Sequence, residues 1–216
     1  MIKAVLFDLD GTLIDSSEGI TKSVQHALKE YGIEENNLEE LKKFIGPPLW
    51  GSFVNYYGFS KQQALEAVDK FRERYNKIGL FECCLYPGAR ECLQRLKDKG
   101  YIVAVASSKP EITCRRILEY HNVLELFDEV SGATMDGRIE TKEEVLNQLF
   151  DRWSDVSKDE MVLVGDTIFD IEGANKVGLK SIGVSFGFGS VDQMESAGAI
   201  SIIDHMNELM QAVDNI

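Results

Sequence analysis

The chain has 216 residues with 44% hydrophobic and 27% charged side chains, which suits a globular protein with one sizeable core or a core plus a small insert. Its formal net charge of -13 argues against a nucleic-acid polymer or an anionic membrane as the main partner, because both bind basic surfaces. No apolar run approaches the roughly 20 residues of a membrane helix, and the N-terminus lacks the pattern of a signal sequence, so we expect a cytoplasmic protein.

The first apolar segment, residues 4–7, is short and continuous, which predicts a strand buried on both faces. Asp8 and Asp10 follow it, and Gly11 marks a turn. Since side chains alternate along a strand, the two carboxylates should lean the same way at the edge where open α/β sheets bind ligands. Two close carboxylates repel each other and are costly to desolvate, so a divalent cation such as Mg²⁺ would suit them. A simple Asp-Gly turn is the alternative explanation for this pair alone.

The next segment has a helical pattern without strands. We expect four helices, with breaks at Gly32, at Gly46-Pro47-Pro48 and at Gly58, over residues 16–31, 38–45, 49–57 and 61–78. A connection between neighbouring parallel strands needs only one helix. The extra helices therefore predict an inserted helical domain, residues 16–81, while residues 1–15 and 82–216 form the core domain.

Helices and strands alternate from Tyr86 onward. Helices are expected at residues 87–99, 111–120, 142–153, 168–177 and 207–213, and strands at 101–106, 127–131, 161–165, 180–184 and 200–203. A glycine-rich loop, residues 186–189, follows the fourth of these strands. Alternation of this kind predicts a parallel sheet covered by helices on both faces. The expected fold class is α/β, a Rossmann-like doubly wound parallel sheet core with an inserted all-helical cap domain.

Polar side chains follow several of the predicted strands. In a parallel sheet, all of them would lie on one rim. Each alone has an ordinary structural explanation, such as a helix cap or a solvated surface charge. Their joint occurrence at strand-to-helix turns is not explained in that way, and it predicts an active site. In chain order the set is Asp8, Asp10, Ser107, Ser108, Lys109, Lys142, Asp166 and Asp170.

The cysteines and histidines indicate no other chemistry. The three histidines, His26, His121 and His205, are scattered and accompany no recognisable nucleophile motif. The four cysteines lack the spacing of a zinc site, so we expect reduced thiols, at Cys83, Cys84, Cys92 and Cys114.

At this point the chain resembles the haloacid dehalogenase superfamily of phosphatases over its whole length. The first family motif is matched by Asp8-Leu-Asp-Gly-Thr-Leu, the second by Ser107, the third by Lys142 and the fourth by Gly165-Asp-Thr-x-x-Asp170. The helical insertion is similar to the C1-type cap of that superfamily. Within it the chain resembles the phosphoglycolate phosphatase-like group, and residues 44–49 and 137–142 look closer to its 5′-nucleotidase-like branch.

The resemblance implies a Mg²⁺-dependent phosphomonoester hydrolase with an aspartyl-phosphate intermediate. Asp8 would be the nucleophile, and Asp10 would protonate the leaving oxygen and then activate water. Lys142 would reduce the repulsion between Asp8 and the phosphate.

The resemblance also implies ligands for the phosphate and the metal. The phosphoryl oxygens would be bound by Ser107, by the Ser108 backbone and by Lys142, with Thr12 near the nucleophile and Lys109 as a weaker candidate. The ligands of Mg²⁺ would be Asp8, the backbone carbonyl of Asp10, Asp166 and Asp170, the last directly or through water.

The expected substrate is a small phosphorylated metabolite, a nucleoside 5′-monophosphate first and 2-phosphoglycolate second, bound by a monomer or homodimer. A sugar-phosphate phosphatase or phosphomutase of the same superfamily is the alternative. A 2-haloacid dehalogenase needs no metal and no second acid, so Asp10, Asp166 and Asp170 argue against it. A phospho-receiver module would have its paired acids a strand or more before the acceptor aspartate and would lack the helical insert.

Overall fold

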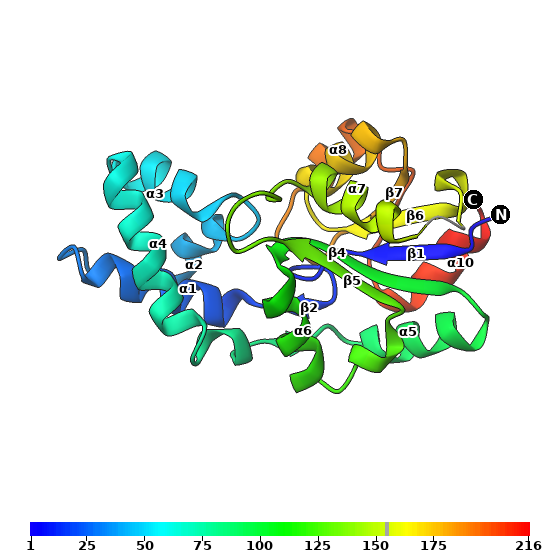
Figure 1. The fold of residues 1–216 in the computed structure, drawn as a ribbon, viewed down its shortest axis with the longest axis horizontal. Helices are drawn as coiled ribbons and strands as arrows, with labels where there is room; N and C mark the ends of the chain where they lie inside the picture. The colour runs from blue at the N-terminus through cyan, green and yellow to red at the C-terminus, as the bar shows by residue number, and fades with distance from the viewer. Residues whose placement is uncertain (154–155) are drawn as a thin grey trace. The chain divides into compact units, whose positions relative to one another are not determined.

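The structure is a computed structural model and describes residues 1–153 and 156–216. Its main feature is a six-stranded sheet in the order β5-β4-β1-β6-β7-β8, in which every neighbouring pair is parallel (Figure 1). The strands are β1 (Ala4–Phe7), β4 (Ile102–Pro110), β5 (Glu129–Ala133), β6 (Met161–Gly165), β7 (Lys180–Val184) and β8 (Ser201–Ile203). The predicted α/β class is confirmed.

The chain divides into two compact units. One consists of Met1–Ile14 and Leu85–Ile216 and contains the six-stranded sheet, and the other is Asp15–Cys84. Two short strands, β2 (Ile14–Asp15) and β3 (Cys84–Leu85), pair with each other where the chain passes between the units. We did not predict these strands, because two residues are too few to show an alternating pattern.

Helices cover both faces of the sheet. In Figure 1, α7 (Lys142–Arg152) and α8 (Ile168–Val177) lie on one face, and α5 (Ala89–Asp98) and α6 (Glu111–Tyr120) lie on the other. Alternate residues of the central strands pack with α7 and α8 in one apolar cluster, which includes Leu6, Ala104, Leu146 and Leu163. The short helices α9 (Val191–Ser196) and α10 (Leu209–Asp214) complete this unit. The first of these was not predicted.

Strand β4 runs four residues beyond the predicted end at Ala106. The sequence Ser107-Ser108-Lys109-Pro110 suggested a turn, but Ser107 and Pro110 still pair with β5, with a register shift between them. This irregularity lies directly beside the end of β1.

The second unit is helical and has its own apolar core. It contains α1 (Ser17–Lys29), α2 (Leu38–Leu41), α3 (Leu49–Tyr57) and α4 (Lys61–Tyr75). Phe53 packs against both Phe44 and Phe59, with ring centroids 5.0 and 5.7 Å apart. The predicted second helix is shorter, because its last turn, Lys42–Phe44, is a 3-10 helix before Gly46 and Pro47.

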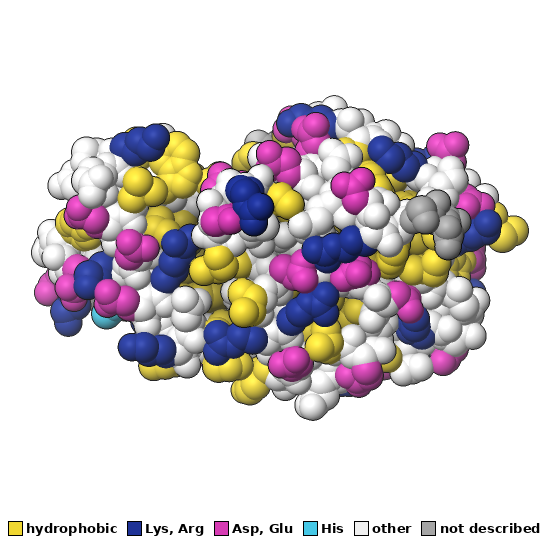
Figure 2. All heavy atoms as spheres, in the orientation of Figure 1, with side chains coloured by type: hydrophobic (Ala, Val, Ile, Leu, Met, Phe, Trp, Pro, Cys, Tyr) yellow, Lys and Arg dark blue, Asp and Glu magenta, His cyan; other side chains and the backbone are white. Residues whose placement is uncertain are grey.

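Neither the drawn surface nor the cysteines mark a further site. On the face drawn in Figure 2, acidic and basic side chains are interspersed rather than gathered in one large patch. All four cysteines are free thiols. Throughout residues 1–153 and 156–216, no helix combines the length and the apolar character needed to cross a membrane.

Candidate active site

The register of the sheet brings the candidate residues of three strands to one edge. Phe7, the last residue of β1, pairs with Val105 of β4 and with Val164 of β6. Asp8 follows β1 directly, and Ser107 of β4 and Asp166 after β6 lie one residue further along the neighbouring strands. This is the carboxyl edge of the sheet, where parallel α/β folds bind ligands.

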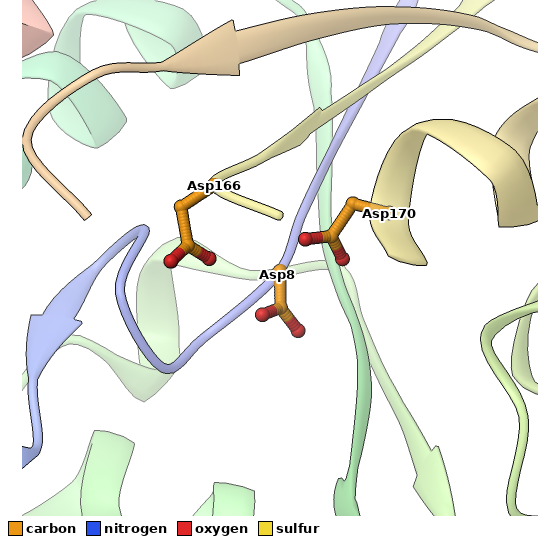
Figure 3. A group of neighbouring side chains, drawn as sticks. All are labelled: Asp8, Asp166 and Asp170. Carbon is orange, nitrogen blue, oxygen red and sulfur yellow. The ribbon is translucent and has the colours of Figure 1, made fainter. Parts of the chain in front are cut away.

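Three buried carboxylates meet at this edge. Figure 3 shows Asp8 after β1, Asp166 after β6 and Asp170 in the first turn of α8, grouped around one point. One oxygen from each lies within 4.8 Å of the other two. Asp170 is 2% exposed, so it is not a solvated surface charge. Its Oδ2 accepts hydrogen bonds from the backbone and hydroxyl of Thr167, which makes it part of the N-terminal capping box of α8.

Lys142 enters this cluster from α7. It is the first residue of the helix, and the preceding Thr141 caps the helix through a capping box with Glu144. The Lys142 ammonium lies 2.7 Å from Asp8 Oδ1, 2.8 Å from Asp170 Oδ1 and 2.7 Å from the carbonyl oxygen of Ala106. A lysine has three N–H donors, so each has an oxygen partner in this arrangement. A phosphoryl oxygen would have to replace one of them.

Burial and mutual repulsion change the proton affinities of these groups. Burial, chiefly, raises the pKa of Asp8 from 3.8 to about 6, against the lowering effect of Lys142. The pKa of Asp166 is raised well above its usual value by burial and by the charges of Asp170 and Asp8. Burial alone would lower the pKa of Lys142, but its ion pairs with Asp170 and Asp8 outweigh that effect and raise it. One ammonium thus pairs with Asp8 and Asp170, while Asp8 and Asp166 are unfavourable to ionise together.

This donor set fits a hard divalent cation. Carboxylate oxygens are the preferred protein ligands of Mg²⁺, and a cation at the meeting point of Asp8, Asp166 and Asp170 would offset the charge that Lys142 leaves uncompensated. The side chain of Asp10 is not part of this group. The expected contribution of Asp10 through its backbone carbonyl stays a prediction.

Asp10 pairs with a second lysine that the sequence analysis had ranked low. Lys109 Nζ lies 2.7 Å from Asp10 Oδ1, and both side chains are largely buried. Lys109 belongs to the irregular end of β4, which neighbours β1 in the sheet. A lysine two residues after the candidate hydroxyl Ser107 was the available signal, but the pairing itself depends on the order of the strands.

The hydroxyl candidates differ in their surroundings. Ser107 is buried, and its hydroxyl accepts a hydrogen bond from the Lys109 backbone at 3.3 Å. Ser108 is exposed. Thr12 is fully buried, and its hydroxyl donates to Asp166 Oδ1 at 3.3 Å. In this structure Thr12 therefore supports a carboxylate of the acidic cluster.

The glycine-rich loop after β7 also reaches the site, which the sequence analysis did not anticipate. The backbone N–H of Phe188 donates to Asp166 Oδ2 at 2.8 Å. The glycines at 187 and 189 were the only signal in the sequence, since they permit a close approach of the backbone.

The fold and the site define an α/β enzyme with a buried, lysine-paired acidic cluster at the carboxyl edge of its sheet. Residues 5–184 match the family model described as haloacid dehalogenase-like hydrolase, so the chain belongs to this family and the resemblance seen in the sequence is confirmed.

Relatives agree with this assignment. The chain is 41% identical over 192 residues to a Pseudomonas aeruginosa protein named 5′-nucleotidase. The aligned region covers 89% of this chain and 86% of the relative. The chain is 32% identical to Tyrosine-protein kinase PtkA of Mycobacterium tuberculosis, over 97% of this chain and 72% of the relative. A solved structure of a predicted phosphatase from Clostridium acetobutylicum is 40% identical, covers 100% of both chains and matches with a TM-score of 0.95.

Proposed function

We propose that this protein is a Mg²⁺-dependent phosphomonoester hydrolase that acts on a small phosphorylated metabolite through an aspartyl-phosphate on Asp8. The observation that carries the proposal is the position of Asp8, which lies at the end of the central strand β1, 2.7 Å from Lys142 and beside two more buried carboxylates. The family match to hydrolases and the relative named 5′-nucleotidase support the same class. The free thiols and the acidic charge support a cytoplasmic location.

In the first step a carboxylate oxygen of Asp8 attacks phosphorus, and the bond between phosphorus and the leaving oxygen breaks. Asp10, which must enter this step protonated and therefore outside its ion pair with Lys109, gives its proton to that leaving oxygen. Lys142 keeps Asp8 oriented and reduces its repulsion from the phosphate. A bound Mg²⁺ would supply the remaining positive charge that lets one anion attack another.

In the second step Asp10, now ionised, takes a proton from the water that attacks the aspartyl-phosphate. Free Asp8 and inorganic phosphate result. The ion pair with Lys109 at 2.7 Å orients this ionised form of Asp10 at the same edge of the sheet. Ser107 and the Ser108 backbone bind phosphoryl oxygens, and we assign Thr12 to the support of Asp166 because its hydroxyl donates there.

We assign the helical segment, residues 16–81, as a cap that excludes bulk water and contacts the leaving group. Its insertion shortly after β1 and the two aspartates that follow this strand supports this role. Exclusion of bulk water strengthens the electrostatic interactions that phosphoryl transfer needs.

The substrate we favour is a nucleoside 5′-monophosphate, because the relative with 41% identity is named 5′-nucleotidase. The second candidate is 2-phosphoglycolate, and sugar phosphates come third. We expect one of these esters to be preferred.

Steady-state release of inorganic phosphate from a panel of these esters tests the proposal, with Mg²⁺ and with a chelator. We expect turnover that requires the metal and that falls at least about a thousandfold in Asp8→Asn, as for other nucleophile deletions. Asp159→Asn, an exposed aspartate, is the matched control. Three outcomes would each overturn the proposal. They are turnover that does not require the metal, an Asp8→Asn variant that keeps a tenth of the wild-type activity, and release of chloride from 2-chloroacids in place of phosphate release.

A further inference from the structure

Asp166 is held by two segments that are far apart in the sequence. One is the turn after β1, which contains Gly11 and Thr12, and the other is the glycine-rich loop after β7, residues 186–189. The side chain of Asp166 is completely buried. Its position is therefore determined by protein groups rather than by solvent.

Neutral donors hold both oxygens of this carboxylate. The Phe188 backbone N–H donates to Oδ2 at 2.8 Å, and the Thr12 hydroxyl donates to Oδ1 at 3.3 Å. Lys142 pairs with Asp8 and Asp170, whereas no ion pair of Asp166 occurs among the described residues. When Asp166 is ionised, its negative charge is left for another cation to balance.

The loop after β7 approaches Asp166 too closely to carry side chains. A Cβ atom at Gly187 would lie 2.3 Å from Asp166 Cβ and 2.5 Å from its Oδ2. A Cβ atom at Gly189 would lie 2.0 Å from the backbone oxygen of Asp166. Neither glycine has a positive φ, so close approach, and not backbone conformation, requires glycine at these two positions.

We propose that the loop of residues 186–189 positions Asp166 as a metal ligand and so determines the affinity of the site for Mg²⁺. Gly187 and Phe188 act as positioning residues, because they contact Asp166 and not the reacting atoms. The inference rests on the proposed metal-dependent function. It extends that function to a segment outside the four motifs on which the family resemblance was based.

The choice of cation follows from the rigidity of this arrangement. Mg²⁺ requires a near-ideal octahedral set of oxygens at short distances, whereas Ca²⁺ accepts longer and less regular ones. The Asp166 carboxylate is fixed by two hydrogen bonds and by the nearby backbone of residues 187–189, and a fixed ligand of this kind suits Mg²⁺. A displaced Asp166 should therefore weaken the binding of Mg²⁺ more than that of Ca²⁺.

The direct test is Gly187→Ala, with binding of MgCl₂ and CaCl₂ to the metal-free protein measured by titration calorimetry in the absence of substrate. We expect the Kd for Mg²⁺ to rise by about tenfold or more, as is typical when a group supporting a metal ligand is changed, and the Kd for Ca²⁺ to rise less. Ser190→Ala is the matched control, since Ser190 is exposed at the end of the same loop and makes no side-chain cap bond. Equal Mg²⁺ affinity in Gly187→Ala and wild type would overturn the inference.

A measurement on the wild-type protein covers the case in which Gly187→Ala does not fold. Hydrogen–deuterium exchange of residues 186–189 should slow as MgCl₂ is added, with a midpoint equal to the calorimetric Kd, and Asp166→Asn should abolish this change. Exchange that is insensitive to Mg²⁺ in a protein that binds Mg²⁺ would refute the role of the loop. Failure of the wild-type protein to bind Mg²⁺ at all would instead refute the metal dependence proposed above.

Discussion

Lys142 balances two buried carboxylates at once, because its ammonium lies within 2.8 Å of oxygens of both Asp8 and Asp170. Removing one partner of a buried charged group leaves the others without compensation, which costs far more than losing a surface ion pair. The same ammonium has no spare donor, so it holds Asp8 and Asp170 together and would have to exchange a partner to contact phosphate. Stability and the proposed catalysis would therefore depend on one side chain.

Lys142→Met should affect both properties. We expect the free energy of unfolding of the metal-free protein at pH 7 to fall by about 3–5 kcal/mol. We expect kcat to fall by about a hundredfold or more, because a preorganised charge beside Asp8 is lost. Urea unfolding and steady-state phosphate release measure the two effects. Lys176→Met, an exposed lysine of α8, is the control, and an unchanged kcat in Lys142→Met would remove this residue from the mechanism.

The raised pKa of Asp8 predicts a pH dependence of stability. Between pH 3.8 and about 6 the folded protein keeps a proton on Asp8 that the unfolded chain releases, so the contribution of Asp8 to the free energy of unfolding falls as the pH rises through this window. The rise of the Asp8 pKa from 3.8 to about 6 corresponds to a change of about 3 kcal/mol in the free energy of unfolding.

Urea unfolding of wild type and Asp8→Asn in a chelator measures this effect, because Asp8 titrates in the wild-type protein alone. Asp8→Asn should gain stability relative to wild type by up to about 3 kcal/mol from pH 4 to pH 7. Saturating Mg²⁺ should reduce the difference in unfolding free energy between the two proteins, because a cation favours the ionised form of Asp8. A difference between the two proteins that does not change with pH would contradict the raised pKa.

At the scale of secondary structure, the N-terminus of α7 connects helix stability to the site. Thr141 caps the helix, and Lys142 is its first residue. Thr141→Ala should lower the free energy of unfolding by about 1 kcal/mol, while Thr141→Ser keeps the hydroxyl and should preserve it. Because fraying of this turn would also move Lys142, kcat should fall in the alanine variant alone. Thermal unfolding measures the stability and phosphate release measures kcat. Equal kcat in the two variants would show that the Thr141 hydroxyl stabilises α7 without affecting the site.

How well the elements could be predicted depends on their local signals. The helices Leu49–Tyr57, Glu111–Tyr120 and Ile168–Val177 match the prediction at both ends, and glycine, proline or a capping residue marks every limit except the end at Tyr120. Strands β2 and β3 were missed, because two residues are too few for a period to develop, and helix α9 was missed as well.

The same distinction holds within the site. Asp8, Lys142, Asp166 and Asp170 could be placed on one rim from their positions after successive strands. Two contacts could not be predicted from the sequence, the pairing of Asp10 with Lys109 and the approach of Phe188 to Asp166. Both depend on which strands become neighbours and on how the chain bends at the strand ends. Local patterns identify the charged groups, whereas tertiary structure decides which of them meet.

For the whole molecule, the division into two units predicts that the catalytic apparatus and substrate choice are separable. The apolar cluster beneath α7 and α8, the acidic cluster and Lys142 all belong to the unit of Met1–Ile14 and Leu85–Ile216. Because β2 and β3 pair with each other, the two chain crossings are neighbours, roughly 5 Å apart as in any strand pair. A short Gly/Ser linker can therefore replace residues 17–82 without stretching the core.

We expect this shortened protein to fold and to bind Mg²⁺ with an affinity close to that of the full chain, because every side chain of the acidic cluster remains. Its kcat/KM for the preferred ester should fall to the level of the poorer esters, because the segment assigned to the leaving group and to water exclusion is gone. Circular dichroism, Mg²⁺ calorimetry and phosphate release across the ester panel measure these three properties. Retained preference in a folded, Mg²⁺-binding variant would place substrate selection in the α/β unit, whereas loss of Mg²⁺ binding would show that the helical unit supports the metal site itself.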